Sequence, residues 1–233
     1  RLSEERIAQL GTFTSVALSL EDPDVPQRNK RVVVTVVEQL PQYLDPRVGF
    51  STGEGVRFAF EYGHRNLGGR AIAGALRLQL AYLPDFLIPQ ELLPAYRKPP
   101  LDNIAYRLER RNALTITLPD IGLGPTWTAA IDLIDLRDLQ RDYALGREAL
   151  VPSVTWRPRR SLSFVASVSA EYNDVLVFNP AASPTTLRLL KVPEGQTAAL
   201  SQRIGATLDF RNNPFAATRG FLLNHLISEM LPG

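Results

Sequence analysis

Residues 49–53 read Gly-Phe-Ser-Thr-Gly and match the Gly-x-Ser-x-Gly spacing of the serine hydrolase elbow. That elbow holds its nucleophilic serine on a strained turn between a strand and a helix. Here the serine is followed by Thr-Gly-Glu-Gly and then by an alternating apolar and polar run that begins at Val56. The pattern therefore predicts a β-hairpin at these residues and no nucleophile.

The other candidates for catalysis or metal binding are isolated. His64 and His225 lack a second histidine at ligand spacing, and the chain contains 0 cysteines, which excludes disulfides, thiolate zinc sites and cysteine nucleophiles. Asp132 and Asp135 fall on opposite faces of a predicted strand, so they cannot act as a carboxylate pair. We expect neither an enzyme nor a cofactor.

Charged residues on the polar side of several predicted strands are more informative. Charges of both signs stay hydrated and pair with one another inside a water-filled barrel. We predict that these side chains face one lumen. The alternative is that they lie on the solvent-exposed face of a β-sandwich. The predicted lumen-facing residues are Arg57, Glu61, Arg77, Arg203 and Asp209.

Apolar and polar residues alternate with period two through most of the chain after about residue 45. This alternation is typical of half-buried β-strands. The regular runs lie at 56–63, 72–82, 161–172 and 203–210, and less regular runs at 105–118, 126–136, 147–156 and 221–230. We count roughly nine strands, many near the length that a membrane strand requires.

The connections between these runs favour a membrane barrel over a sandwich. Short and long links alternate along the chain, as in an up-and-down barrel with one short-looped side. Aromatic residues near the predicted strand ends, such as Tyr62, Trp127 and Trp156, fit interface girdles. The short links are 66–70, 120–125, 157–160 and 212–220, the longer ones are 83–104, 137–146 and 179–198, and the short hairpin at 52–55 breaks the rule.

The first 40 residues have a different pattern. A helix is expected at residues 3–10, because Ser3 can cap it and two glutamates follow. Strands are expected at 13–20 and 31–38, and residues 40–43 are expected to be a linker. This order predicts a small α+β piece, the tail of a domain, and the chain resembles an excerpt of a longer polypeptide.

The charge balance and the lengths of the apolar runs exclude some classes of protein. The chain has 233 residues, is 45% hydrophobic and carries 26 basic against 24 acidic residues. This balance gives no reason to expect a nucleic acid partner. No apolar run approaches the roughly 18–20 residues that a spanning helix needs, whereas alternating membrane strands remain compatible with the composition.

Within residues 47–58 the chain reads Gly-Phe-Ser-Thr-Gly-Glu-Gly, and a later turn reads Asn66-Leu67-Gly68-Gly69-Arg70. These two motifs resemble the G-x-S-T-x-E-G hairpin and the N-L-F-G-R-G turn of the BamA/TamA outer-membrane assembly family, which belongs to the bacterial surface antigen superfamily. Gly68 stands where the family has Phe, and Ala71 where it has the final Gly.

A second turn, residues 210–220, is similar to the family's D-x-R-D-N-P-x-x-P-T-R-G segment. Asn212 stands where Asp is usual and Ala217 where Pro is common. The matching positions are Arg211, Asn213, Pro214, Arg219 and Gly220. Residues 1–40 resemble the end of a polypeptide-transport-associated (POTRA) domain.

The resemblance implies a mostly β fold, with residues 1–40 as the last part of a POTRA domain and 41–233 as the first half of an antiparallel, up-and-down transmembrane β-barrel of about sixteen strands. It implies the outer membrane of a Gram-negative bacterium, with the POTRA part in the periplasm. The implied activity is assembly and insertion of outer-membrane proteins without a cofactor. The implied partners are outer-membrane lipid, unfolded outer-membrane protein clients and accessory assembly subunits.

The expected client-pairing edge is the first barrel strand, Pro46-Arg47-Val48-Gly49-Phe50-Ser51. Its shortness and two apolar anchors, Val48 and Phe50, predict a weak seam at which a nascent strand pairs by β-augmentation. One alternative is a two-partner-secretion pore that passes a polypeptide through the lumen. Another, of a different class, is a soluble β-sandwich binding module.

Overall fold

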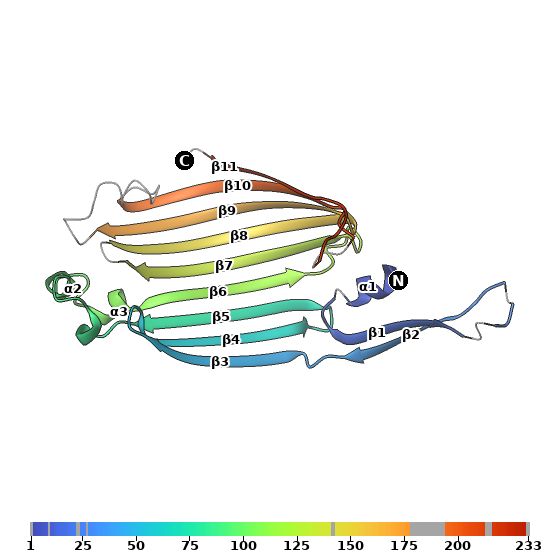
Figure 1. Ribbon diagram of the computed structural model, residues 1–233, viewed down its shortest axis with the longest axis horizontal. Helices are drawn as coiled ribbons and strands as arrows, with labels where there is room; N and C mark the ends of the chain where they lie inside the picture. Colours follow the sequence, from blue (N-terminus) through green and yellow to red (C-terminus); the bar gives the residue numbers. More distant parts are fainter. Residues whose placement is uncertain are drawn as a thin grey trace.

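The computed structural model describes residues 2–8, 10–21, 24–26, 28–140, 143–177, 194–212 and 216–231. The described chain is mostly β, with short helices. It forms a two-stranded sheet, β1–β2, and a nine-stranded sheet in the order β11-β10-β9-β8-β7-β6-β5-β4-β3. Every neighbour in the large sheet is also the next strand in the sequence (Figure 1), so the predicted up-and-down antiparallel order is confirmed.

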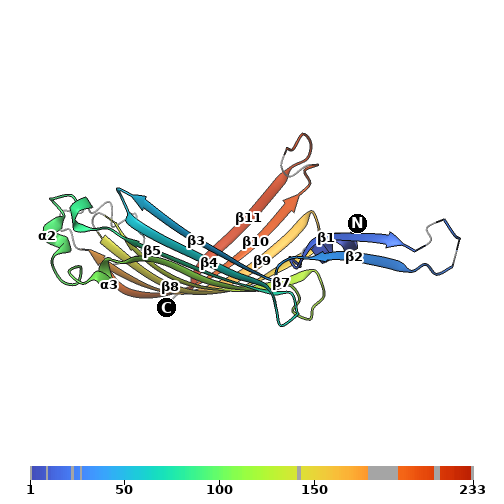
Figure 2. The same ribbon diagram turned by 90° about the horizontal axis from the view of Figure 1, so that it is seen from below.

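The large sheet is curved and twisted and is not closed (Figure 2). Among the described residues, β3 and β11 each have a neighbour on one side, which leaves an open edge at both ends of the sheet. Its strands are β3 Gln42–Ser51, β4 Gly55–Leu67, β5 Ile72–Tyr82, β6 Glu109–Leu118, β7 Trp127–Leu139, β8 Tyr143–Arg159, β9 Leu162–Val177, β10 Gly195–Asp209 and β11 Leu222–Leu231.

The boundaries of β3, β7 and β8 correct two expectations. β3 begins at Gln42, so residues 42 and 43 belong to the sheet and not to a linker. β7 and β8 are joined by residues 140–142, so the long link expected at 137–146 is short. The strands continue here because backbone pairing does not require apolar side chains, and alternation in the sequence fades where the strands carry charges.

The strand expected from residue 105 begins later, at Glu109. Residues 104–107 instead form a short helix, α3 Ile104–Arg107, whose start is capped by Asn103. The Asn103 side chain accepts a hydrogen bond from the backbone N–H of Ala105 over 2.9 Å. A local cap of this kind offsets the β-propensity of a short segment.

The connection at 83–108 folds into a small cap at one end of the sheet (Figure 1). It contains the 3₁₀-helix η1 Asp85–Leu87 and α2 Leu93–Tyr96 in addition to α3. Arg107 is buried and forms an ion pair with Asp85 at 2.7 Å. We call this end of the sheet the cap end. The small apolar core of the cap consists of Ile88, Leu92 and Tyr96.

The N-terminal unit lies beyond the opposite end of the large sheet (Figure 1). It consists of α1 Leu2–Ala8 and the antiparallel pair β1 Phe13–Leu20 and β2 Val32–Glu38, close to the predicted boundaries. Its order is the expected helix and two strands, and its identity as a POTRA domain, like the domain boundary at residue 40, stays a prediction. Within the described residues, no helix is long and apolar enough to cross a membrane.

Alternation gives the large sheet a polar face and an apolar face, which can be followed through the registers from strand to strand. One continuous row of paired residues on the apolar face is Leu44, Tyr62, Leu76, Leu114, Leu133, Leu150, Ala170 and Leu200. In β9 the apolar-face residues Val168 and Tyr172 are exposed, whereas Asn173 on the polar face is buried. This is the pattern of a curved sheet whose polar face is concave.

Candidate functional site

The predicted lumen-facing residues all lie on the polar face, but they form two separate groups. In the first group, Arg77 on β5 lies opposite Glu61 on β4, with 3.4 Å between Arg77 Nε and Glu61 Oε1. Arg57 forms an ion pair with Glu54 in the hairpin before it. The first of these pairs joins β4 to β5 on the polar side, and the second joins β4 to the hairpin before it.

The second group lies on β10, several strands away. Arg203 is exposed, and Asp209 at the strand end accepts a hydrogen bond from Arg211 at 2.8 Å. The hydrogen bond to Asp209 raises the pKa of Arg211 above its ordinary value, so this pair remains charged over the physiological range. The five residues share a face, but the described structure does not gather them into one cluster.

Sequence reasoning missed two further ion pairs on the polar face. Arg111 lies 3.0 Å from Asp138, and Arg147 lies 2.6 Å from Glu171. Both pairs join neighbouring strands, β6 to β7 and β8 to β9, and each has at least one residue in a less regular run, where alternation is weak. Register arithmetic along the strands could have found them, because each pair shares a face. Arg111 and Arg147, together with Ile134, line a shallow hollow of about 390 Å³ on the polar face.

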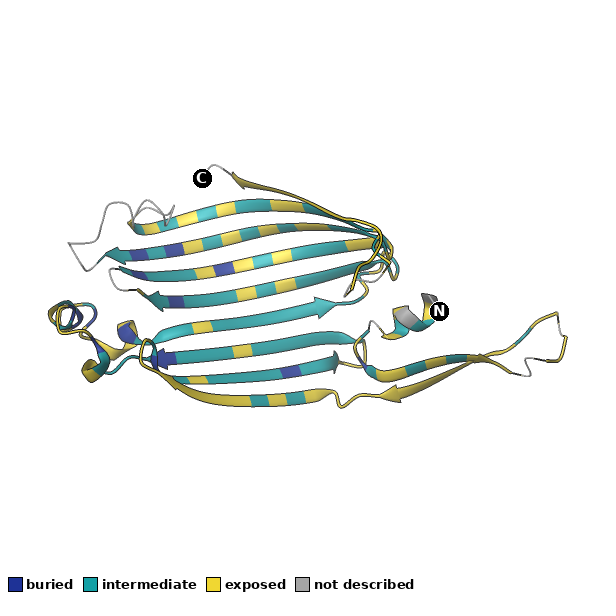
Figure 3. Ribbon diagram, viewed as in Figure 1, coloured by how far each residue is buried: buried dark blue, intermediate teal, exposed yellow. Residues whose placement is uncertain are grey.

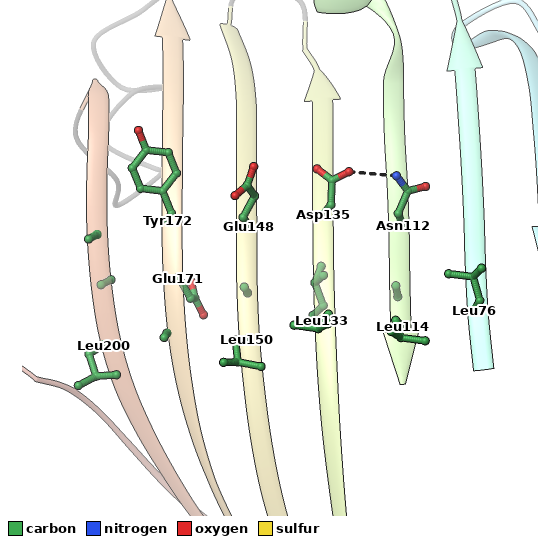
Figure 4. Close-up of a pocket in the computed structure, with 16 residues that line it drawn as sticks. Leu76, Asn112, Leu114, Leu133, Asp135, Glu148, Leu150, Glu171, Tyr172 and Leu200 are labelled. Atoms are coloured by element: carbon green, nitrogen blue, oxygen red, sulfur yellow. Dashed lines mark hydrogen bonds between the residues drawn. The ribbon is translucent and has the colours of Figure 1, made fainter. Parts of the chain in front are cut away.

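The apolar face carries a broad, shallow hollow of about 790 Å³ over β5 to β10. Its floor is the row of leucines, and polar residues lie beside them toward the cap end (Figure 4). This boundary between apolar and polar side chains is what a bilayer interface requires of the outer wall of a barrel. The polar residues at this boundary are Asn112, Asp135, Glu148 and Tyr172.

The predicted client-pairing edge lies at one free edge of the sheet, and the strand extends further than predicted. β3 is largely exposed, whereas β4 beside it is half-buried (Figure 3). The apolar side chains of Val48 and Phe50 are 78% and 62% exposed. Leu44, which the prediction left out, is 61% exposed. This apolar stripe stands open at the edge, so the edge can accept another strand.

Tyr43 anchors the beginning of β3. It faces Gly63 on β4, and a Cβ atom added at Gly63 would overlap the Tyr43 ring. The Tyr43 hydroxyl donates to Glu61 over 3.0 Å, and the Arg65 guanidinium lies 4.6 Å from the centre of the Tyr43 ring. These contacts hold β3 against β4 from the polar side and leave its other edge open.

The hydrogen-bonding direction of each residue in β3 can be assigned. The N–H of Arg65 donates to the carbonyl of Pro41 over 2.7 Å, and the register from Gln42 to Ser51 has no shift. Hydrogen-bonded and non-hydrogen-bonded pairs alternate in an antiparallel ladder. Odd-numbered residues therefore bond to β4, and even-numbered residues direct their N–H and C=O groups to the free edge. Pro46 belongs to the even set, which explains why a proline is tolerated inside this strand.

The predicted turn at Asn66–Arg70 joins β4 to β5. The Asn66 side chain accepts a hydrogen bond from the N–H of Ala71 over 2.8 Å. Gly68 and Gly69 have φ values of +62° and +71°, a region that glycine enters without strain. Glycine at 68, where the resemblance expected Phe, is therefore suited to the turn.

The second predicted turn joins β10 to β11. The Asn212 side chain accepts hydrogen bonds from the N–H groups of Thr218 and Arg219 at 3.2 and 3.1 Å. Gly220 has a φ of +100°, and a Cβ atom there would overlap the Phe210 carbonyl. Asn213 and Pro214, which belong to the same predicted motif, lie outside the described residues. Asn212 thus fills the bonding role expected of Asp.

Comparisons with known proteins bear on the fold. No family model and no curated protein matches the chain. The chain is similar to the crystal structure of BamA from Haemophilus ducreyi lacking POTRA domains 1–3, with a TM-score of 0.56 and 12% sequence identity. The match covers 100% of this chain and 42% of that chain, so the chain spans less than half the length of this neighbour. The nine-stranded sheet is thus consistent with half of a BamA barrel.

Proposed function

We propose that the protein assembles and inserts outer-membrane proteins and that β3 is the strand on which client strands form. The observation that carries the proposal is the exposed, apolar free edge of β3 in an open sheet with one membrane-like face. The similarity in fold to a BamA barrel supports the same role.

The physical reason is the need for paired backbone groups inside a bilayer. An unpaired N–H or C=O group in hydrocarbon costs several kcal/mol, so a nascent strand gains from a template edge. The even-numbered residues of β3 present such groups along the free edge. A client strand that pairs there satisfies its own backbone as it enters the membrane.

The proposal places the apolar face against outer-membrane lipid and the polar face toward a water-filled lumen. The leucine row and the polar boundary at Asp135 and Glu148 support the first assignment. The ion pairs on the polar face support the second. The N-terminal unit then lies on the periplasmic side, as a POTRA domain would, and its helix–strand–strand order supports that assignment. Unfolded outer-membrane proteins are the proposed clients, with accessory assembly subunits as further partners.

The runner-up is a two-partner-secretion pore, and the charged polar face favours it. Arg111 and Arg147 are each about half exposed despite their ion pairs, as the wall of a hydrated passage would be. A pore role predicts that bulky substitutions on the polar face block transport while changes at the β3 edge do not. The sandwich alternative is disfavoured, because the described residues place no second sheet against the apolar face.

Photo-crosslinking in the full-length protein tests the proposal. A photoreactive residue at Val48, at the free edge, should capture a client arrested during assembly. The matched control is Leu80, which lies in the same row as Val48 but is paired on both sides. Capture at Val48 and not at Leu80 is expected. Equal capture at both positions, or none at Val48, would contradict a role for the β3 edge.

A further inference from the structure

We propose that a partner β-strand is held at the free edge of β3 by Val48 and Phe50, and that Pro46 ends this pairing. The inference rests on the proposed function in one respect, the identity of the partner as a client strand. The placement of the hydrogen-bonding groups does not depend on it.

The argument begins with the donors that face the free edge. The hydrogen bond between Arg65 and Pro41 fixes the alternation, and the register continues without a shift through Ser51. The outward N–H groups therefore belong to Gln42, Leu44, Val48 and Phe50. Pro46 is in the middle of this set and has no N–H. The free edge is thus divided into two short donor segments.

The missing donor has a consequence for any antiparallel partner. The partner residue opposite Pro46 can donate its own N–H to the Pro46 carbonyl. The carbonyl of that partner residue, however, receives no hydrogen bond from Pro46. No side-chain change in the partner removes that carbonyl. Inside a bilayer such an orphan group is costly. A partner strand therefore gains most by pairing on one side of Pro46.

The segment beyond Pro46, toward the cap end, is the better binding site. Val48 and Phe50 each offer one N–H and one C=O, and both side chains are more than 60% exposed. The segment before Pro46 is crossed on its polar side by Tyr43, whose ring is engaged with Gly63 and Arg65. Pairing at residues 48–50 leaves those contacts undisturbed.

The same geometry defines the chemistry of the partner strand. Residues opposite Val48 and Phe50 lie on the apolar face, so they should be apolar. The residue between them lies on the polar face beside Gly49, where nothing lies within 4 Å of an added Cβ atom. A bulky or polar side chain fits there. The partner is therefore an amphipathic strand with alternating apolar residues, held by few hydrogen bonds and easily released.

Two substitutions test the role of Pro46. Pro46→Ala adds an outward donor, and Pro41→Ala is the matched control, because Pro41 faces β4. The first measurement is amide hydrogen exchange at Val48 and Phe50 in the client-free full-length protein in lipid, where the last strand of the barrel is the partner strand at this edge. Both amides should exchange faster than Gly49, whose N–H faces β4. Pro46→Ala should slow them about two- to tenfold, the value of one added hydrogen bond, and Pro41→Ala should not.

The second measurement is the release rate of an unfolded eight-stranded outer-membrane protein bound to the full-length protein. Pro46→Ala should slow release by a similar factor, and Pro41→Ala should leave it unchanged. If exchange at Val48 and Phe50 is unaffected by Pro46→Ala, or equally affected by Pro41→Ala, the inference is wrong. If exchange changes as expected but release does not, Pro46 limits only the pairing of the barrel's last strand with β3. In that case the proposed role of β3 in binding clients is wrong.

Discussion

Individual contacts along β3 explain how an edge strand can be firmly attached on one side and open on the other. Tyr43 binds to β4 through its ring and its hydroxyl, while Val48 and Phe50 on the apolar face remain largely exposed. The sequence indicated Val48 and Phe50 through alternation. It did not indicate Tyr43, because Tyr43 can pack against β4 only where the facing residue is a glycine. Which residue faces Tyr43 depends on the register, and the register cannot be read from one strand alone.

Gly63 provides a test at the residue scale. Gly63→Ala should displace the Tyr43 ring and destabilise the barrel by about 1–3 kcal/mol, the usual cost of overpacking. The measurement is urea unfolding of the full-length protein in lipid vesicles. Gly49→Ala is the control, since nothing lies within 4 Å of its added Cβ atom. Equal stability of the two variants would show that the Tyr43 contact does not hold β3.

Adjacent residues on opposite faces give a second test at this scale. Leu133 lies on the apolar face and Ile134 on the polar face of β7. Leu133→Lys should cost roughly 2–4 kcal/mol if that face contacts hydrocarbon, and Ile134→Lys should cost much less. Folding free energies in vesicles measure both. A similar cost for the two variants would mean that the apolar face is not in lipid.

At the scale of elements, alternation predicted the number and order of the strands better than their ends. Strands β7 and β8 continue beyond the apolar band through Arg137 and Gly146, which pair with each other. These residues were expected in a loop, because alternation reports which face is apolar and says nothing of backbone pairing among polar residues. The two turns at Asn66 and Asn212 were predictable for the opposite reason, since turn geometry depends on local side chains.

Strand β8 contains a proline in the interior of the sheet. The N–H of Arg157 donates to the carbonyl of Thr126, just before β7, over 2.8 Å, so the N–H and C=O groups of even-numbered residues of β8 face β9. Residues 151 and 152 are not paired with β9, although the register is the same on both sides of them. The carbonyl of Val168, opposite Pro152, therefore lacks a ladder donor.

Pro152→Val should restore that donor and stabilise the barrel by about 0.5–1.5 kcal/mol. The unfolding midpoint of the full-length protein in detergent, with the slope unchanged, measures the effect. A destabilised variant would show that the sheet requires the proline, for example to bend β8.

At the scale of the whole molecule, the described structure is an open sheet with unpaired groups along β3 and β11. The sequence predicted an open half-barrel from the number of strands and from a family resemblance. It could not give the curvature, which arises from the summed twist of nine paired strands and from no single residue.

The open edges predict the behaviour of residues 1–233 expressed alone. Unpaired strands in a bilayer are costly, so the fragment should aggregate or pair edge to edge in detergent. Light scattering after size-exclusion chromatography measures the mass. A monodisperse, heat-resistant monomer would contradict an open sheet in the membrane.

The central claim, that clients form on the β3 edge, is tested most directly by locking that edge. Residues 1–233 contain 0 cysteines, so they add no competing thiol to a disulfide that joins β3 to the last strand of the full-length barrel. A second disulfide between residues 44 and 62, which already face each other on β3 and β4, is the control. The rate of client insertion into vesicles should fall to background in the first variant, recover on reduction, and stay unchanged in the control. Insertion at the unlocked rate in the first variant would mean that β3 is only a strand of the barrel wall and does not pair with client strands.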